Sequence, residues 1–335
     1  MAATTQLSME MADAHTNVTG LQDITRIWAS FHFLPFDLYA QLPDRSHRYM
    51  QKYRLICNPN GRLVADTVQL AKGRGLEACG LAMHVLADTW AHRYFAGTPS
   101  FVINNATHFV ELITIDGEEQ ERPIQFSHNP RTEEDVEKNH FVSSLYQNNE
   151  NSMMNLGHGR AGHLPDYSFM RYRFLPAWGN YKEIIKDNPD DYYHAFCQMV
   201  YALKTLRDDH LTFEVERYDY QAVEPYKEEI FAILKKRQVN ACEDWKALGQ
   251  KMSGCLIDDF DINRYAKEYM EAPVRHKSFL GRFFLAAMEQ KSMVTRKIFE
   301  SGNLLAGISI DYEKMDFKGM KEFKRLVKAK ESRKL

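Results

Sequence analysis

The chain lacks both an apolar run long enough to cross a bilayer and a secretory signal. No stretch of its 335 residues approaches the roughly 18 apolar residues that a membrane helix needs. The first fifteen residues have neither the basic segment nor the apolar segment of a signal peptide. These absences predict a cytoplasmic protein without a transmembrane segment.

Cysteine is scarce, and neither sign of charge dominates. The five cysteines are scattered and include no C-x-x-C pair, which predicts free thiols rather than a disulfide framework. Lys and Arg number 43 against 45 Asp and Glu, a formal charge of −2. This balance argues against a protein that owes its affinity to a large basic surface, although nucleic acid stays open as a partner through local patches.

Two segments nevertheless carry concentrated charge. Residues 111–150 contain ten acidic and three basic residues, a local charge of −7, whereas residues 314–334 contain nine basic and three acidic residues, a local charge of +6. Segments of this kind are usually solvated faces. The alternative is that the acidic segment, the basic segment or both bind a protein partner, or that the basic one binds nucleic acid.

Helical periodicity dominates the rest of the chain. Apolar residues recur every three to four positions over 62–72, 76–94, 188–206, 225–238, 241–252, 263–270 and 277–300. The segment 188–191 (NPDD) predicts the start of the third of these helices, with Asn188 as its N-cap and a proline at the first helical position. The only convincing β signal is a short hairpin that starts at 111, turns at Asp116-Gly117 and ends near Phe126. We therefore predict a mainly α fold, a multi-helical single domain with a small β-hairpin excursion and a helical C-terminal extension. If the chain divides, residues 1–220 form a helical domain that carries the His/Asp motifs. Residues 221–335 then form a helical region with the basic tail.

The central motif places His84, Asp88 and His92 four residues apart on the predicted helix 76–94. Each step of four turns the side chain by only about 40°, so all three share one face. The two histidines are about 12 Å apart along the axis, which is too far for one ion with bonds of about 2 Å. The spacing favours two neighbouring metal sites with Asp88 between them. The alternative is a seam in which Asp88 hydrogen-bonds both histidines.

A second segment, 156–166, combines three glycines and a proline with His158, His163 and Asp166. Such a loop could complete a site begun on a rigid helix. Its G-x-G-x-x-G spacing does not predict a dinucleotide site, because no buried strand precedes it and Pro165 interrupts any following helix. Arg160 in the same loop could bind a phosphate or carboxylate, or pair with a neighbouring acid.

Near the N-terminus, Asp13 and His32 are further candidates. His32 lies between aromatic residues in the segment 31–35 (FHFLP), where a hydrogen-bonded core histidine is more common than a ligand. The sequence contains no H-E-x-x-H, P-loop or G-x-S-x-G motif.

Three segments together resemble the signatures of an uncharacterised bacterial family known only as a domain of unknown function. They are FHFLP at 31–35, GLAMHVLADTWAH at 80–92, and GHGRAGHLPD at 157–166. In that family a segment with paired acids precedes them, and the best match here is Asp13. The helix with its His and Asp four apart is also distantly similar to the zinc-dependent phospholipase C and S1/P1 nuclease class. That resemblance implies an all-helical fold with a zinc cluster that cleaves phosphodiesters.

We therefore expect a metal-dependent hydrolase-like protein that acts on a phosphoester. Its expected ligands are His84, Asp88 and His92, with His158, His163, Asp13 and His32 as further ligands. Asp166 is a general base or a ligand, and Arg160 contacts the substrate. Zinc is the first choice of metal, with manganese or iron as alternatives. The competing hypothesis is a non-catalytic helical interaction module, in which the same residues form a structural metal site or a buried His/Asp network.

Overall fold

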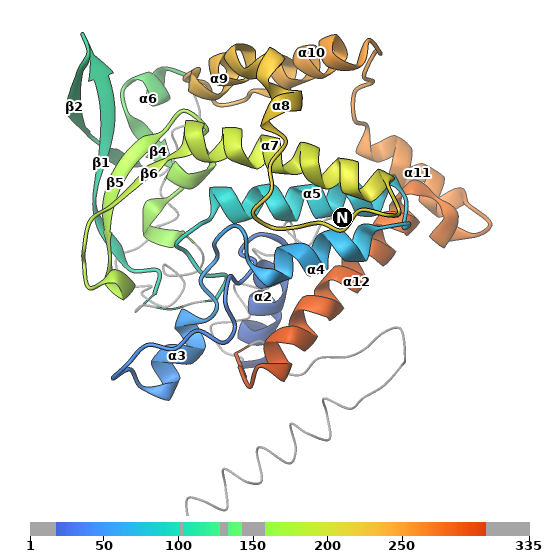
Figure 1. Ribbon diagram of the computed structural model, residues 1–335, viewed down its shortest axis with the longest axis horizontal. Coiled ribbons are helices and arrows are strands. Elements are labelled where there is room, and N and C mark those ends of the chain that lie inside the picture. Colours follow the sequence, from blue (N-terminus) through green and yellow to red (C-terminus); the bar gives the residue numbers. More distant parts are fainter. Residues whose placement is uncertain (1–17, 99, 101–102, 128–132, 143–157, 306–335) are drawn as a thin grey trace, which may run out of the picture.

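The computed structural model describes residues 18–98, 100, 103–127, 133–142 and 158–305. A layer of helices surrounds a central helix, α5 (Leu76–Ala91), and a small sheet lies at one end of this layer (Figure 1). Asp13 and the basic segment 314–334 lie outside the described residues, as do parts of the acidic segment 111–150.

The prediction of a mainly α fold is wrong, because a four-stranded antiparallel sheet makes the protein mixed α and β. The strand order is β2-β1-β5-β6, and the bounds are β1 Ala106–Ile115, β2 Glu118–Pro123, β5 Arg171–Pro176 and β6 Ile184–Asp187. The hairpin of β1 and β2 agrees with the prediction, and its turn residues Asp116 and Gly117 both have positive φ. The sequence analysis missed β5 and β6, which come from a segment that lacks the usual run of apolar strand residues.

The alternation of β5 explains how it fits into the sheet. Tyr172 and Phe174 are fully buried, whereas Arg171 and Arg173 point to the other face. There Arg171 pairs with Glu119, and Arg173 Nη2 lies 2.7 Å from Glu121 Oε1 on β2. These cross-strand pairs neutralise part of the acidic segment within the sheet itself.

A second, two-stranded parallel sheet joins β3 (Gln125–Ser127) to β4 (His140–Val142), with the short helix α6 (Glu133–Glu137) before β4. Phe126, where the predicted hairpin was expected to end, is in β3 rather than β2, and it pairs with Phe141. Phe141 is fully buried in a core that also contains Tyr172 and Phe174. This core lies on one face of the larger sheet and under the loop 158–170.

The seven predicted helices are present. Their bounds are α4 Arg62–Ala71, α5 Leu76–Ala91, α7 Asn188–Arg207, α9 Lys227–Lys235, α10 Cys242–Ser253, α11 Ile262–Glu271 and α12 Phe279–Glu300. The structure adds α2 (Val18–Phe31), α3 (His47–Tyr53) and α8 (Tyr220–Val223). The N-cap of helix α7 is Asp187 rather than the predicted Asn188, since the Asp187 side chain accepts a hydrogen bond from the Asp190 backbone N–H.

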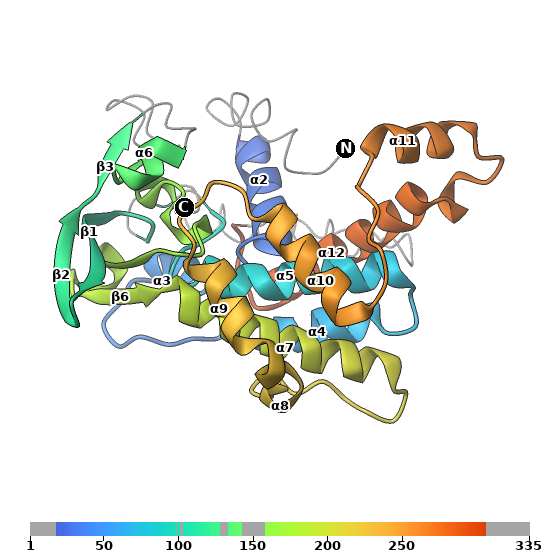
Figure 2. The same cartoon turned by 90° about the horizontal axis from the view of Figure 1, so that it is seen from above.

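Helix α5 is buried on most of its circumference because α2, α4, α7 and α12 all pack against it (Figures 1 and 2). Val85 and Leu86 on this helix are almost inaccessible. Burying each side chain of this size stabilises the fold by about 1.5–3 kcal/mol. Leu76, the first residue of the helix predicted over 76–94, is by contrast 86% exposed although it is apolar. His84 is exposed and Asp88 is half-buried on the polar side of α5, and the buried His92 directly follows the helix.

Residues on both sides of position 220 contribute to the same cores. Val294 and Ile298 of α12 belong to the cluster around α5, and Leu248 of α10 packs with Tyr193 and Cys197 of α7. The division into residues 1–220 and 221–335 stays a prediction. All five cysteines are free thiols. Across the described residues, no helix combines the length and apolarity needed to span a membrane.

Candidate metal centre

The first group of ligand atoms joins the end of α2 to the exposed edge of α5. It comprises His32, His84 and Asp88, whose ligand atoms all lie within 4.8 Å of one another. His32 Nδ1 is 2.8 Å from Asp88 Oδ2, and His84 Nε2 is 3.5 Å from the same oxygen. His32 directly follows α2, and its backbone N–H still donates to Trp28 O at 3.0 Å. The end of α2 therefore aims the imidazole at α5.

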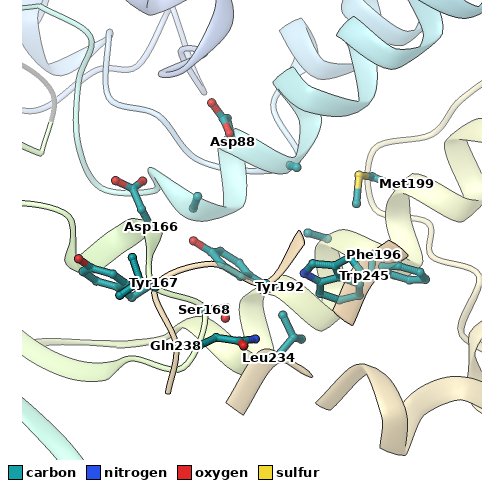
Figure 3. A pocket seen from close by; sticks show the side chains of 15 residues that line it. Asp88, Asp166, Tyr167, Ser168, Tyr192, Phe196, Met199, Leu234, Gln238 and Trp245 are labelled. Carbon is teal, nitrogen blue, oxygen red and sulfur yellow. The ribbon is translucent and has the colours of Figure 1, made fainter. Parts of the chain in front are cut away.

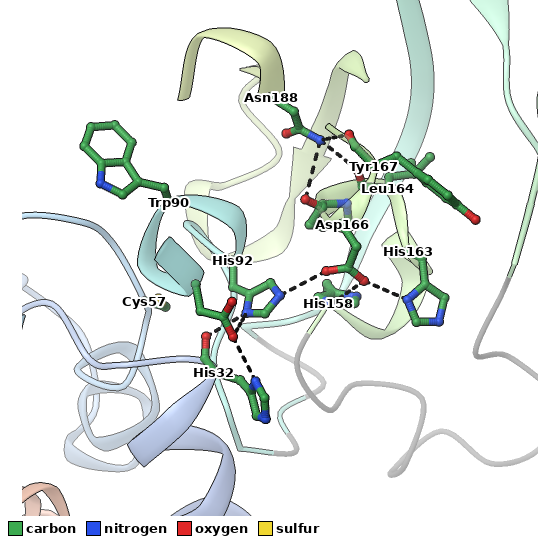
Figure 4. Close-up of polar contacts among 12 residues, drawn as sticks. His32, Cys57, Trp90, His92, His158, His163, Leu164, Asp166, Tyr167 and Asn188 are labelled. Atoms are coloured by element: carbon green, nitrogen blue, oxygen red, sulfur yellow. Dashed lines mark hydrogen bonds and ion pairs between the residues drawn. The ribbon is translucent and has the colours of Figure 1, made fainter. Parts of the chain in front are cut away.

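The second group joins the end of α5 to the loop 158–166. It comprises His92, His158 and Asp166, again with ligand atoms within 4.8 Å of one another. His92 Nε2 lies 3.1 Å from Asp166 Oδ1, and His158 Nε2 lies 3.6 Å from Asp166 Oδ2 (Figure 4). His163 adds a fourth polar side chain, with its Nδ1 2.7 Å from Asp166 Oδ2.

His92 connects the two groups. Its Nδ1 lies 2.6 Å from the backbone oxygen of His32 and 3.8 Å from Asp88 Oδ2, while its Nε2 faces Asp166. Phe33 stacks on the ring at a centroid separation of 4.5 Å and fixes its plane. The structure thus assigns His84 and His92 to different groups, as the 12 Å helical separation predicted. Asp88 and Asp166 stand on either side of one buried imidazole.

The chain leaves α5 in a constrained conformation that holds His92 in place. The His92 N–H donates to Asp88 O at 2.9 Å and closes the helix. Tyr94 then adopts a positive φ of 81°, and its N–H donates to Cys57 O at 2.8 Å. Gly97 approaches α2 so closely that a Cβ would lie 2.8 Å from the Ala29 nitrogen. This position has no room for a side chain, so α2 and the end of α5 keep a fixed separation.

The start of α7 holds the loop that carries Asp166. Its fully buried Asn188 donates from Nδ2 to Leu164 O at 2.9 Å and to Tyr167 O at 2.7 Å (Figure 4). The Tyr192 hydroxyl donates to Pro165 O. These bonds satisfy carbonyls around the short 3₁₀ helix η3 (Leu164–Asp166), which has too few residues to satisfy them itself.

The charges around Asp166 are unevenly distributed. Burial would raise the pKa of Asp166, but His158, His163 and His92 hold it well below its usual value. Burial would likewise lower the pKa of His92, but Asp88 and Asp166 raise it to about 9. For His158 burial dominates and lowers the pKa to about 4. At neutral pH this set therefore contains an ionised Asp166, a protonated His92 and a neutral His158.

Both groups fit a divalent metal ion by donor chemistry and by spacing. Zinc bonds of about 2.0–2.1 Å at tetrahedral angles place neighbouring donor atoms about 3.3 Å apart. Within the first group the contacts to Asp88 Oδ2 are 2.8 and 3.5 Å, and within the second group those to Asp166 are 3.1 and 3.6 Å, so each pair of distances brackets this value. Two imidazoles with one carboxylate are also a ligand set that zinc, manganese and iron accept. Either group could therefore hold one ion.

A cavity of about 350 Å³ lies between the groups and is lined by side chains from both. Its charged or ionisable walls are His32, Asp88, His92, His158, His163 and Asp166. Among the described residues that line it there is no Lys or Arg. Nothing on this part of the wall balances a negatively charged ligand, except a protonated imidazole or a bound cation.

The structure brings together all the described residues that the sequence predicted as ligands. Arg160, which was predicted to contact the substrate, lies in the 3₁₀ helix η2 (Gly159–Ala161). It is not among the described residues that line this cavity. Sequence reasoning missed Asn188 and Tyr192. The motif at 188–191 was recognised only as a helix start, because a side chain that supports a distant loop leaves no local pattern.

Comparison with known proteins agrees with the expectation of a family of unknown function. Residues 1–298 match the model of DUF6765, a family of unknown function, and the chain belongs to this family. No curated protein matches the chain, and no solved structure matches it. The similarity to zinc-dependent phospholipases and nucleases therefore stays an expectation drawn from the motifs.

Proposed function

We propose that this protein is a metal-dependent hydrolase that acts on a phosphoester. One observation carries the proposal. Two groups, each of two imidazoles and one carboxylate, are joined through His92, and every member of both groups except His84 lines a common cavity. This arrangement is suited to a pair of ions on either side of one substrate group, as in two-metal hydrolases.

The number of donors favours a catalytic over a structural site. Structural zinc is closed by four protein ligands, whereas catalytic zinc has three and keeps one position for water or substrate. Each group offers three donors within the described part of the chain. The cavity beside them leaves space for the remaining position.

The charge of the cavity favours an anionic substrate only when metal is present. Asp88 and Asp166 would repel a phosphate, and no Lys or Arg in the described wall compensates for them. A bound divalent ion would supply that compensation, lower the pKa of a coordinated water toward neutrality and stabilise charge on the phosphoryl oxygens. Zinc is the first candidate, with manganese or iron as alternatives.

We assign roles to the side chains from their contacts. Asp166 is a ligand rather than a general base, because three imidazoles hold its pKa well below its usual range and leave it a weak proton acceptor. His163 is the proton donor to the leaving group. It is half exposed, and its hydrogen bond to Asp166 through Nδ1 raises its pKa. Its Nε2 is the nitrogen that Asp166 does not engage.

The competing function, a buried polar network in a non-catalytic interaction module, also has an observation in its favour. His32 Nδ1 contacts Asp88, His92 Nδ1 contacts the His32 carbonyl, and His163 contacts Asp166, all within 2.8 Å. These contacts give the side chains involved hydrogen-bond partners without any ion. Metal content of the purified protein separates the hydrolase from an ion-free polar network, and ester hydrolysis separates it from a module with a structural metal site.

The first experiment measures metal content after expression in zinc-, manganese- or iron-supplemented medium. We expect two ions per chain in the wild type and loss of one ion in each of Asp88→Asn and Asp166→Asn. Asp190→Asn is the matched control, since Asp190 contacts His194 at 3.3 Å with the same four-residue spacing but lies outside both groups. This control should retain both ions.

The second experiment measures hydrolysis of aryl phosphomonoesters and phosphodiesters before and after treatment with a chelator. Activity should disappear with the metal and return on reconstitution. A wild-type protein that binds no metal under any of the three conditions contradicts the proposal. A metal-loaded protein that is inactive on every ester supports the interaction module instead.

A further inference from the structure

A second and larger cavity, of about 510 Å³, adjoins the candidate metal centre. Both Asp88 and Asp166 line it, as they line the smaller cavity between the two groups. The remainder of its wall comes from α5, α7, the loop after η3, and the segment that runs from the end of α9 into α10. Its volume falls in the range of about 300–1,000 Å³ that small-molecule sites occupy.

The chemistry of this cavity changes from one end to the other. Figure 3 shows Asp88 and Asp166 on one side and Met199, Phe196 and Trp245 on the other. The two aspartates are the only charged side chains among the described residues that line the cavity. The remaining wall is mostly apolar or aromatic, with Leu234, Val239 and several alanines between the rings.

Two polar side chains of this wall are engaged by the protein. The Tyr192 hydroxyl donates to Pro165 O, and Gln238 Nε2 donates to Asp244 Oδ2 at 2.9 Å. Phe196 and Trp245 stack with centroids 6.0 Å apart, which gives the far end a flat aromatic surface. A ligand in this part of the cavity is therefore recognised by apolar contact rather than by charge.

We propose that this cavity binds a neutral apolar substituent, alkyl or aryl, of the substrate whose phosphoryl group occupies the metal centre. The proposal rests on the proposed function, because the two shared aspartates place the apolar wall next to the ions. Each methylene that leaves water for this wall favours binding by about fourfold. Sugar, nucleotide and other strongly polar substituents lack this gain and would lose hydrogen bonds to water.

The test compares two homologous series on the metal-loaded full chain. The first is hydrolysis of p-nitrophenyl phosphodiesters whose second substituent is ethyl, butyl, hexyl or phenyl. The second is calorimetric binding of ethyl-, hexyl- and phenylphosphonate, which needs no turnover. We expect kcat/KM and affinity to rise on the order of 100-fold from ethyl to hexyl if four methylenes are buried. The phenyl compounds show whether the aromatic end prefers a ring.

Two variants place the effect in this cavity. Trp245→Ala removes the aromatic end, and Met199→Gln replaces an apolar wall atom with an amide at nearly constant size. Both should reduce the hexyl-to-ethyl ratio at least tenfold while metal content stays the same. Phe260→Ala is the control, since Phe260 is a 66% exposed aromatic that does not line the cavity. It should leave the ratio unchanged.

The outcomes separate this proposal from the proposed function. Equal turnover and equal binding of ethyl and hexyl compounds would overturn the apolar pocket even if hydrolysis is robust. The pocket is likewise overturned if no phosphonate binds, or if both variants keep the wild-type ratio. A third outcome is phosphonate binding that increases with chain length and that Met199→Gln weakens, without turnover of any ester. This result supports the apolar pocket and contradicts the proposed hydrolase function.

Discussion

Replacing Asn188 by alanine should weaken metal binding at the second group although Asn188 contacts neither histidine nor Asp166. Its Nδ2 holds the carbonyls of Leu164 and Tyr167, and its Oδ1 accepts a hydrogen bond of 2.7 Å from Lys186 Nζ. Without it, the short turn that carries Asp166 loses its anchor to α7. We expect Asp166 to move away from His92 and His158.

The magnitude follows from the three lost contacts. Each hydrogen bond to a loop carbonyl contributes about 1 kcal/mol, and a buried ammonium group that loses an acceptor costs about 1–3 kcal/mol. Lys186 is fully buried but keeps Asp191 Oδ2 at 3.1 Å and Trp90 O at 3.2 Å. The free energy of unfolding should therefore fall by about 3–5 kcal/mol. Affinity for the second ion should fall by about 10–100-fold, as when other residues that support metal ligands are removed.

Two comparison variants separate loop positioning from loss of stability. Asn188→Asp keeps an acceptor for Lys186 but turns a second oxygen toward the loop carbonyls. It should therefore reduce the affinity for the second ion as strongly as Asn188→Ala does. Asn303→Ala is the matched control. Asn303 is also fully buried, and its Nδ2 donates to Gln51 O at 2.6 Å on α3, which contributes no residue to either group.

Urea unfolding gives the stability of each variant, and zinc calorimetry on metal-free protein gives the two affinities. Asn303→Ala should lose stability while both ions bind as in the wild type. A folded Asn188→Ala protein with two ions of wild-type affinity would refute the reasoning. So would an Asn303→Ala protein that loses the second ion, since the effect would then follow from stability alone.

Two further predictions concern protons and a buried ion pair. In the metal-free protein the pKa of His92 is raised to about 9 from the usual 6.5, so the stability that its proton contributes is complete below about pH 6.5 and lost as pH rises toward 9. Zinc must displace this proton, so binding at pH 7 should release about one proton at His92, whereas His158, with its pKa near 4, should release none. Calorimetry in buffers of different ionisation enthalpy measures this number, and zero release would contradict the assignment. Arg237→Met should lower the free energy of unfolding by about 3–5 kcal/mol because the carboxylate of Glu111, 1% exposed, loses its contact with this guanidinium and keeps the more distant Arg122, whose Nη1 is 3.9 Å from Oε2. Arg217→Met, which breaks an exposed pair, should cost at most about 1 kcal/mol in the same urea measurement.

The helices could be predicted from the sequence because their signals are local. Apolar spacing and the Asn188-Pro189 start place α5 and α7 to within a few residues. The larger sheet could not be predicted in full, since β5 and β6 are short and their stability comes from partners elsewhere in the chain. β5 pairs with β1, more than fifty residues earlier, and its outward arginines are balanced by glutamates of β2. The strand propensity of the six residues of β5 does not reveal such distant pairing.

The candidate site shows the same distinction between local and distant information. The four-residue spacing on α5 predicted one face with His84, Asp88 and His92, and predicted that the histidines serve different sites. It did not pair His32 with Asp88, because the FHFLP segment alone favours a core histidine. That pairing depends on Gly97, which lets α2 approach the chain after α5. The apolar cavity could not be predicted from the sequence either, since its wall combines residues from α5, α7, the loop after η3 and the segment that runs from the end of α9 into α10.

The placement of Asp88 and Asp166 constrains what this site can select. Each lines both cavities, so under the proposed function a phosphoryl group bound between the two groups would lie directly beside the apolar wall. The loop with Asp166 is held by Asn188 and Tyr192 of α7, and the next turns of the same helix provide Ala195, Phe196 and Met199 to that wall. A shift of α7 would therefore move the candidate metal ligand Asp166 and the apolar wall together. Substitutions of Phe196 or Met199 should alter substrate preference without metal loss, whereas substitution of Asn188 at the start of the helix should alter both.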